Sequence, residues 1–304
     1  MRGKRKRKDV SEFSLHLLDN ILLLHKELAE KTYTHSSYQA FRINDPKPRD
    51  IHKANVRDRL LHHAVYRILY SYFDRKFIFD SYSCRINKGT HRAINRFRAF
   101  GRKVSKNNTR VAWVLKCDIR KFFASINHQI LIENLKKHID DNDAMWLIGE
   151  IINSFHTDEA SVGLPLGNLT SQLLINVYMN EFDQFVKRKL NVQYYLRYAD
   201  DFVVLNNNKS YLVNLVAQMS QFLENNLKLS LHPKKVFIKS LSSGIDFLGW
   251  VHFPYHRVLR TATKRRMLRR LKDNHSRETI ASYVGLLKHG NTYKLLQKIM
   301  YRLL

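Results

Sequence analysis

The residues best suited to chemistry in this sequence are three aspartates, Asp118, Asp200 and Asp201. Asp118 ends an apolar run (VAWVLKCD) over residues 111–118, and the adjacent pair interrupts a second apolar run over residues 194–205. Two neighbouring carboxylates between hydrophobic strands repel each other and lose hydration, which is costly unless a cation neutralises them. If the first strand ends beside this pair, the three carboxylates form an oxygen-rich site suited to Mg²⁺.

Such a site is suited to nucleotidyl transfer. Two divalent ions about 4 Å apart activate an attacking hydroxyl group and stabilise a leaving pyrophosphate. The alternative is that Asp200 and Asp201 form a polar turn that binds no ion. The aromatic and β-branched residues on both sides of the pair favour a buried hairpin, and with it the metal site.

The charge of the chain indicates the partner for this chemistry. Among 304 residues there are 53 lysines and arginines against 26 aspartates and glutamates, so the formal net charge is +27. A polyanion is the usual partner that relieves such an excess. Because the basic residues are spread along the chain and are not gathered beside one amphipathic anchor, they favour nucleic acid over a membrane surface.

Composition argues against several other classes of protein. Apolar residues make up 44% of the chain, which is too many for a disordered protein. No apolar run reaches eighteen residues, and the basic start (MRGKRKRK) lacks the apolar stretch of a signal peptide. We therefore expect a soluble, intracellular protein without membrane contact. Cys84 and Cys117 have no CxxC spacing and predict neither a zinc site nor a disulfide.

The elements that must position the aspartates show both helical and strand patterns. Apolar residues recur at helical spacing over residues 13–28, 58–72, 131–138, 144–155, 171–190 and 212–227. Strand patterns occupy residues 111–115, 193–205 (two strands), 229–238 and 245–253. Three helical stretches follow, at residues 264–272, 278–288 and 293–304. This order predicts an α+β fold in which helices cover a sheet.

Two finer expectations follow from the same patterns. The helix over residues 58–72 should bury one face made of Leu60, Leu61, Val65, Ile68 and Leu69. Two prolines within residues 44–49 predict a loop or hairpin tip, and residues 163–167 (GLPLG) predict a loop before the next helix.

With these motifs in place, the sequence resembles a reverse transcriptase over nearly its whole length. Residues 198–201 (YADD) resemble the YxDD box of that family, and residues 118–123 (DIRKFF) resemble its first catalytic motif. Residues 163–172 (GLPLGNLTSQ) match the loop and helix that back the nascent base pair. Residues 229–235 (LSLHPKK) resemble the motif that carries a lysine, and residues 247–250 (FLGW) resemble the primer grip.

The resemblance implies a right-hand polymerase with fingers, a palm made of an antiparallel sheet backed by helices, and a small three-helix thumb. Residues 46–49 (PKPR) and 83–85 (SCR) fit the fingers motifs. The implied division is a basic tail and N-terminal helix over 1–30, fingers over 31–110, a palm over 111–255 with finger elements around 140–170, and a thumb over 256–304.

The resemblance also assigns roles at the metal site. Asp118 and Asp200 would hold two Mg²⁺ ions, for which Mn²⁺ is a possible substitute, with help from the backbone carbonyl of Ile119. Asp201 would be the third catalytic carboxylate of the metal site and would tune it. Phe123 would be a steric gate against the ribose 2′ hydroxyl, and its alternative is an ordinary core residue.

Further residues are implied to bind the nucleotide. Lys47 and Arg49 would clamp the triphosphate, unless they are solvated charges on a loop. Lys235 would donate a proton to the leaving pyrophosphate, although Lys234 beside it leaves that assignment open. The remaining nucleotide contacts would be Leu166, Gly167 and Gln172. The primer grip would be Leu248, Gly249 and Trp250, for which a plain core strand is the alternative.

The third box indicates a subfamily. Most reverse transcriptases carry Gln before its glycine and end the box in Ser-Pro, whereas here Leu166 precedes Gly167 and the box ends in Ser171 and Gln172. This form resembles the enzymes of diversity-generating retroelements, within the group II intron-like bacterial superfamily. Those enzymes copy a template-repeat RNA into cDNA with errors opposite adenine, so that a variable gene is rewritten by mutagenic retrohoming.

This subfamily implies a set of partners and a place of action. The partners are template RNA, the cDNA/RNA duplex, dNTPs and a small, basic, oligomeric accessory variability protein, all in the cytoplasm of a bacterium or a phage-infected host cell. An apolar Leu166 offers only shape where Gln offers hydrogen bonds, so we expect it to weaken discrimination between nucleotides. The alternatives are a retron, group II-like or phage-defence reverse transcriptase, and a noncatalytic RNA-binding scaffold.

Overall fold

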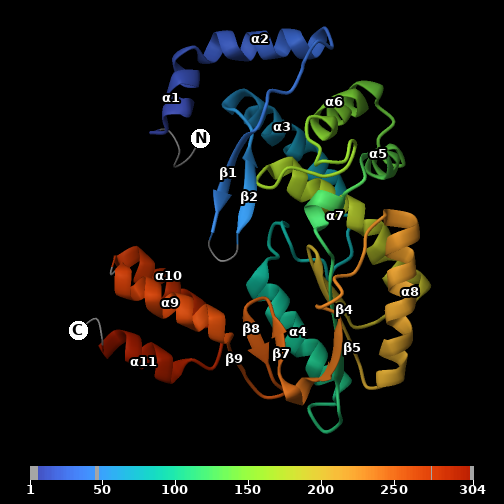
Figure 1. The fold of residues 1–304 in the computed structure, drawn as a ribbon, viewed down its shortest axis with the longest axis vertical. Helices are drawn as coiled ribbons and strands as arrows, with labels where there is room; N and C mark the ends of the chain where they lie inside the picture. The colour runs from blue at the N-terminus through green and yellow to red at the C-terminus, as the bar shows by residue number, and fades with distance from the viewer. Residues whose placement is uncertain (1–5, 45–47, 275, 302–304) are drawn as a thin grey trace. The chain divides into compact units, whose positions relative to one another are not determined.

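The computed structural model describes residues 6–44, 48–274 and 276–301. The chain divides into two units, each with its own core. Unit 1 comprises residues 1–79, 119–189 and 220–230, and unit 2 comprises residues 80–118, 190–219 and 231–304. The element labels used below are those of Figure 1. No described helix is long and apolar enough to cross a membrane.

Unit 2 is built around an antiparallel sheet with the strand order β4-β5-β3-β6. Its strands are β3 (Trp113–Asp118), β4 (Tyr195–Tyr198), β5 (Asp201–Asn206) and β6 (Phe237–Ser240). The central strands β3 and β5 are rich in β-branched and apolar residues, which suit a strand that is covered on both faces. The two strands expected over residues 193–205 are therefore confirmed, and so is the strand before Asp118.

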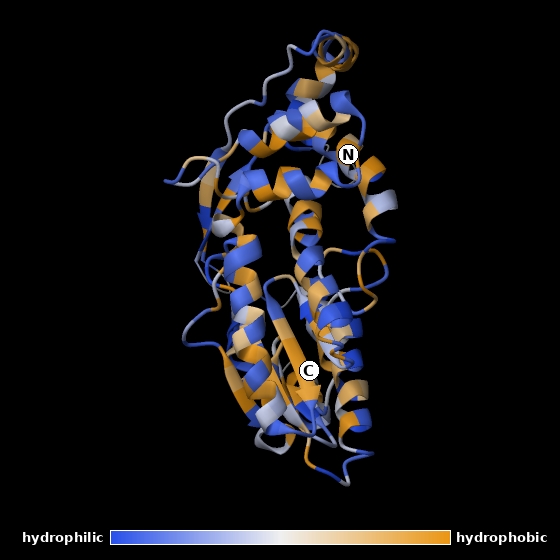
Figure 2. Ribbon diagram, turned by 90° about the vertical axis from the view of Figure 1, so that its right-hand side faces the viewer, coloured by the Kyte–Doolittle hydropathy of each residue, from blue (hydrophilic) through white to orange (hydrophobic). Residues whose placement is uncertain are grey.

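One face of this sheet is covered by α4 (Thr90–Val104). The apolar residues of α4 recur at intervals of three and four, which gives the helix one buried face. That face packs with sheet residues in one core cluster, which includes Ala93, Phe97, Phe100, Val104, Val114, Leu196, Val203 and Leu205. Figure 2 shows the result: the strands carry long orange stretches, whereas the helices alternate between blue and orange.

A second core in unit 2 joins a small sheet to the C-terminal helices. The strands β7 (Ile245–Phe247), β8 (Trp250–His252) and β9 (Arg257–Leu259) pair antiparallel in that order. They are followed by α9 (Thr261–Asp273), α10 (Arg277–Leu287) and α11 (Tyr293–Tyr301). Trp250 is buried against Met267, Leu271 and Leu287 in this core. The three C-terminal helices expected from the sequence are confirmed over the described residues; the end of the last one, residues 302–304, lies outside them.

Two strand predictions were wrong in extent. The single strand expected over residues 245–253 is a hairpin, because Leu248 (φ +51°) and Gly249 (φ +84°) form a two-residue turn between β7 and β8. Of the strand expected over residues 229–238, only the last two residues are in a strand, as the start of β6. The earlier part forms none, because Pro233 has no N–H for a strand ladder. A turn forms there, in which the Lys235 N–H donates to His232 O at 3.0 Å.

Unit 1 is mostly helical. It contains α1 (Lys8–Leu15), α2 (Leu17–Ala29), α3 (Val56–Phe73), α5 (His128–Lys136), α6 (Asn142–Asn153) and α7 (Leu169–Gln184), which a π-helical turn (Phe185–Lys189) extends. A hairpin of β1 (Gln39–Ile43) and β2 (Arg49–Lys53) precedes α3 (Figure 1). The helix α8 (Lys209–Leu227) begins in unit 2 and ends in unit 1. The helix expected over residues 13–28 is two helices, which are separated at His16.

The predicted buried face of α3 was wrong in part. Leu60 is 39% exposed and Ile68 is 73% exposed, whereas Asp58 and His62 are buried together with Leu61. Asn55 caps the helix by accepting a hydrogen bond from the Asp58 N–H at 2.8 Å. The helix is thus rotated so that a polar pair four residues apart faces the interior, because these side chains have hydrogen-bond partners there.

We predict that acid destabilises unit 2 through His252. Burial lowers the pKa of His252 to about 3, from 6.5 in an exposed chain, with a further contribution from the charge of Arg257. The unfolded chain therefore binds a proton between pH 6.5 and pH 3 that the folded chain does not, so stability falls as the pH falls through this window. From pH 7 to pH 4 the loss amounts to about 3 kcal/mol.

The matched variants are His252→Phe, which keeps a ring between Phe97 and Phe247, and His256→Phe, which alters an exposed residue of the same β8–β9 hairpin. Urea unfolding at pH 7 and pH 4 should show a smaller pH-dependent loss in His252→Phe than in the parent and in His256→Phe. Equal losses in all three proteins would contradict the assignment.

Candidate active site

The three aspartates meet at one end of the central sheet. Asp118 ends β3, Asp201 begins β5, and the two are directly paired across the antiparallel ladder. The hairpin between β4 and β5 pairs Tyr198 with Asp201, so Ala199 and Asp200 form its two-residue turn, with Ala199 at φ +55°. The structure therefore brings together the carboxylates that the sequence placed in separate apolar runs.

A buried arginine supports this turn. Arg197 is fully buried, and its Nη1 donates to Ala199 O at 3.1 Å while its Nη2 donates to Ser81 Oγ at 3.2 Å. Its backbone N–H also donates to Asp80 O at 3.0 Å. Hydrogen bonds from a buried charged group are stronger than neutral ones, so Arg197 fixes the strained position of Ala199. Sequence reasoning missed this residue, although one arginine inside an apolar strand was a signal.

Two lysines neutralise two of the carboxylates. Lys116 Nζ lies 3.3 Å from Asp201 Oδ2, and Lys235 Nζ lies 2.8 Å from Asp118 Oδ1. The Lys116 and Asp201 side chains are only 15% and 18% exposed, so this pair is little screened by solvent, whereas the Lys235 side chain is 43% exposed and its pair with Asp118 is screened more. Lys116 was not predicted, but it precedes Asp118 by two residues and so lies on the same face of β3.

One carboxylate oxygen of this cluster, on Asp201, is buried without a hydrogen-bond donor in the part of the chain that the structure describes. Asp201 Oδ1 is buried and has no hydrogen-bond partner among the described residues. Burial raises the pKa of Asp201 to about 7; Lys116 opposes this rise, and the charges of Asp200 and Asp118 add to it. A buried acceptor without a donor is costly, and a bound cation would remove that cost.

The donor chemistry fits a divalent metal ion, although the ligands are not assembled around one. No group of three or more His, Cys, Asp or Glu side chains within the described parts of the chain forms a ready metal cage. Lys116 and Lys235 each pair with one of the carboxylates. Carboxylate oxygens are nevertheless the ligands that hard divalent ions prefer. Cys117 is no ligand candidate, since burial raises the pKa of its thiol to about 12.

The expected nucleotide-binding residues of the third box lie in unit 1. Leu166 is half-buried and its carbonyl accepts a hydrogen bond from the His52 N–H at 2.9 Å. Gly167 has φ +116°, and an added Cβ would lie 2.8 Å from Ile51, so glycine is required at this position. Gln172 lies in the first turns of α7.

The remaining nucleotide candidates vary in their setting. Phe123 is half-buried in a 3₁₀ turn (Phe122–Ser125), and its carbonyl accepts from the Leu164 N–H at 2.8 Å. Arg49 is exposed at the start of β2, whereas Lys47 lies outside the described residues. Lys235 contacts Asp118, as described above, which distinguishes it from its exposed neighbour Lys234.

The primer-grip candidates divide into turn and core. Leu248 and Gly249 form the turn between β7 and β8. Trp250 is 1% exposed, and a Cβ added to Gly290 would overlap its ring. Trp250 is therefore a core side chain next to this turn, as the alternative of a plain core strand expects, and a primer contact of these three residues stays a prediction.

Comparison with known proteins gives a consistent result. The family model "Reverse transcriptase (RNA-dependent DNA polymerase)" matches residues 43–252. Protein YkfC of Escherichia coli K12 is 26% identical in an alignment 272 residues long; the match covers 76% of this chain and 69% of YkfC. The group II intron-encoded protein LtrA of Lactococcus lactis subsp. cremoris is 24% identical in an alignment 275 residues long; the match covers 68% of this chain and 45% of LtrA.

Solved structures agree at the level of the fold. A truncated apo telomerase from Candida tropicalis has a TM-score of 0.57 at 12% identity and covers 81% of this chain and 60% of the telomerase chain. A telomerase from Candida albicans in complex with a fragment of telomeric RNA also gives a TM-score of 0.57, at 8% identity, and covers 79% of this chain and 51% of the telomerase chain. The mixed helices and antiparallel sheets have the reverse transcriptase fold, in agreement with the expected right-hand polymerase class.

We predict that divalent metal stabilises the folded protein through these aspartates. Mg²⁺ at about 100 times its dissociation constant should add about 2.7 kcal/mol, and therefore raise Tm by several degrees. The gain should be largely lost in Asp200→Asn and kept in Asp140→Asn, which alters an exposed aspartate outside the site. Differential scanning calorimetry with and without Mg²⁺ measures it, and an undiminished gain in Asp200→Asn would refute the site.

Proposed function

Because the chain belongs to the reverse transcriptase (RNA-dependent DNA polymerase) family, we propose that it joins deoxynucleotides on an RNA template at a metal centre formed by Asp118, Asp200 and Asp201. The observation that carries the proposal is the direct pairing of Asp118 with Asp201 across β3 and β5, one residue from Asp200. The unpartnered Asp201 Oδ1 adds support, since a protein without metal chemistry would gain by removing it.

The residues of this chain have distinct tasks in the proposed reaction. Asp118 and Asp200 would hold the ions, with the Ile119 carbonyl, and Asp201 would act mainly as a positioning carboxylate because Lys116 already pairs with it. Two bound divalent ions would supply activation of the 3′ hydroxyl and charge neutralisation on the pyrophosphate. Lys235 Nζ would leave Asp118 when the metal binds and donate its proton to the leaving pyrophosphate.

Primer extension tests this proposal. With an RNA template, a DNA primer, dNTPs and Mg²⁺, Asp200→Asn should reduce the extension rate by about three orders of magnitude, equivalent to about 4 kcal/mol. Asp140→Asn should extend at the parental rate. Extension by Asp200→Asn at the parental rate would eliminate the metal assignment, and a parent protein that binds RNA without extension would favour the noncatalytic scaffold.

We further propose that the enzyme is of the diversity-generating type. The support is the GNLTSQ form of the third box, in which the apolar Leu166 stands beside the exposed Gly167. In this proposal the enzyme uses Mg²⁺ in the bacterial cytoplasm to copy a template-repeat RNA, together with a small basic accessory protein. Leu166 would contribute the errors opposite adenine, because its side chain discriminates by shape alone.

A second candidate is a group II-like bacterial reverse transcriptase of another kind. The relatives favour it, because YkfC and the group II intron-encoded LtrA align with 76% and 68% of this chain. The two candidates share the same polymerase chemistry and differ in template and fidelity. A template repeat and a variable gene beside the coding gene would favour the first.

Fidelity distinguishes the candidates directly. We predict that Leu166→Gln lowers misincorporation opposite template adenine severalfold, because Gln adds a polar contact that a wrong partner leaves unpaired. Leu166→Met, which keeps an apolar side chain of similar size, should keep the parental error spectrum. Sequencing of cDNA from a defined RNA gives both rates; an unchanged adenine error rate in Leu166→Gln would count against a role for this residue.

A further inference from the structure

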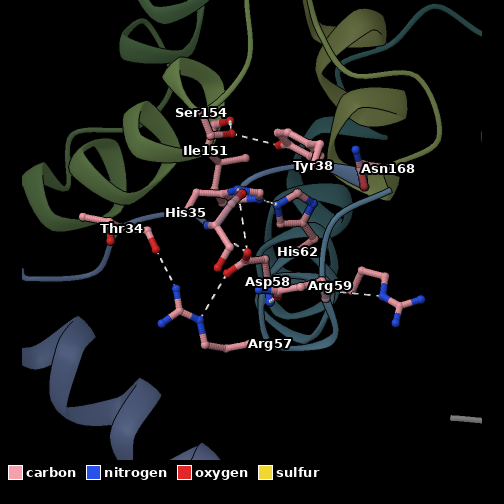
Figure 3. Close-up of polar contacts among 12 residues, drawn as sticks. Thr34, His35, Tyr38, Arg57, Asp58, Arg59, His62, Ile151, Ser154 and Asn168 are labelled. Atoms are coloured by element: carbon pink, nitrogen blue, oxygen red, sulfur yellow. Dashed lines mark hydrogen bonds and ion pairs between the residues drawn. The ribbon is translucent and has the colours of Figure 1, made fainter. Parts of the chain in front are cut away.

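A buried polar cluster in unit 1 is not used by the proposed chemistry. Asp58 and His62 lie four residues apart on α3 and are 0% and 2% exposed. The Asp58 carboxylate accepts hydrogen bonds from Tyr33 Oη at 2.9 Å and from the Ser36 N–H at 3.0 Å. It also lies 3.7 Å from His35 Nδ1. Figure 3 shows His35 and His62 facing each other beside Asp58.

The two imidazoles form a directed chain of hydrogen bonds. His35 Nδ1 lies 2.6 Å from Ser36 O, His35 Nε2 lies 3.1 Å from His62 Nε2, and His62 Nδ1 lies 3.1 Å from Thr170 Oγ1. A carbonyl only accepts, so His35 Nδ1 carries the proton. In the tautomer in which His62 Nε2 donates to His35 Nε2, His62 Nδ1 accepts a hydrogen bond from the Thr170 hydroxyl. Burial lowers the pKa of His62 to about 4, which keeps its ring neutral.

The last of these hydrogen bonds joins the two histidines to the third box. Thr170 is 3% exposed, lies in the first turn of α7 and follows Gly167 by three residues. Contacts from β2 hold the Leu166–Gly167 turn: the His52 N–H donates to Leu166 O at 2.9 Å, and Asn168 Nδ2 donates to His52 O at 3.0 Å. Contacts from β2 and α3 thus fix the Leu166–Gly167 turn. The α3 contact is the hydrogen bond between His62 and Thr170, just after the turn.

Packing alone does not account for a histidine and a hydroxyl at this place. The neighbouring cavity is lined by apolar side chains, among them Val65, Leu69, Ile151 and Leu173. An apolar pair would fill the same space without the cost of burying polar groups. Hydrogen bonds add direction, because they fix the angle and the depth of the groups that they join. The hydrogen bonds through His35, His62 and Thr170 are therefore suited to hold the adjoining segment in one position.

We propose that His62 is a positioning residue that holds the Leu166–Gly167 turn through Thr170 and thereby sets nucleotide selection. The inference rests on the proposed function, in which this turn contacts the nascent base pair. The polar cluster around Asp58 is rigid, because Arg57 donates to Glu27 at 2.8 Å, to Thr34 O at 2.6 Å and to Asp58 at 3.3 Å. Loss of the Thr170 hydroxyl would leave the aspartates intact but release the turn.

The test uses two substitutions at one position. Thr170→Val removes the hydroxyl and keeps the shape, whereas Thr170→Ser keeps the hydroxyl. In steady-state single-nucleotide extension, Thr170→Val should raise KM for the correct dNTP about tenfold, a factor equal to 1.4 kcal/mol, with a smaller change in kcat. Its ratio of correct to incorrect insertion should also change, and Thr170→Ser should restore both values toward the parent. A parental KM and insertion ratio in Thr170→Val would overturn the proposal, as would equal defects in Val and Ser.

A second pair of variants tests the histidine itself. His62→Phe should reproduce the KM and insertion defects of Thr170→Val, whereas His63→Phe, which alters the exposed neighbour on α3, should retain the parental values. If His62→Phe fails to fold, the Thr170 pair still decides. Equal effects of His62→Phe and His63→Phe on the insertion ratio would argue against the role of His62.

Hydrogen exchange separates this proposal from the function on which it rests. Amides of residues 166–171 should exchange faster in Thr170→Val than in Thr170→Ser, by more than the difference in the global unfolding free energy of the two variants explains. Equal exchange in the two variants would overturn the positioning claim, whatever the activity. A parent protein without primer extension would instead refute the proposed function, and with it the role of His62 in nucleotide selection. The exchange data would still decide whether the His62–Thr170 hydrogen bond holds the turn.

Discussion

The structure depends on the repulsion among three carboxylates at the end of one β-sheet. Such a cluster is stable only if positive charge is placed beside it. The chain supplies part of that charge through Lys116 and Lys235, and among the described residues one buried oxygen of Asp201 has no hydrogen-bond partner. The site is therefore neutralised enough to fold, and in the proposed enzyme it would still attract a cation. In the proposed enzyme, metal ions would replace Lys235 at Asp118, which would free the lysine for the leaving group.

Buried polar groups away from the carboxylates follow a related logic. Arg197 in unit 2 holds the turn that carries Asp200, and the His35–His62 pair in unit 1 holds the turn that carries Leu166. Each uses directional hydrogen bonds where an apolar side chain would only fill space. Each turn contains one residue at positive φ, Ala199 in the first and Gly167 in the second; the strain falls on Ala199, because glycine adopts such angles readily.

The sequence predicted the parts of the site whose signals are local. The apolar runs around Asp118 and Asp201 predicted their strands, and β-strand pairing then brought them together. The periodicity of apolar residues was less useful where polar side chains are buried, because it assigns charged and histidine residues to the surface. It therefore placed Ile68 in the core in place of His62, and it overlooked Arg197 entirely. These partners come from distant segments, so only the folded chain reveals them.

A crystal structure with Mn²⁺ and a nonhydrolysable deoxynucleoside triphosphate would locate the metal by anomalous scattering, without reference to activity. We expect manganese bound by Asp118 and Asp200, with Lys235 Nζ moved away from Asp118. Manganese bound elsewhere, with the Lys235–Asp118 pair intact, would contradict this expectation.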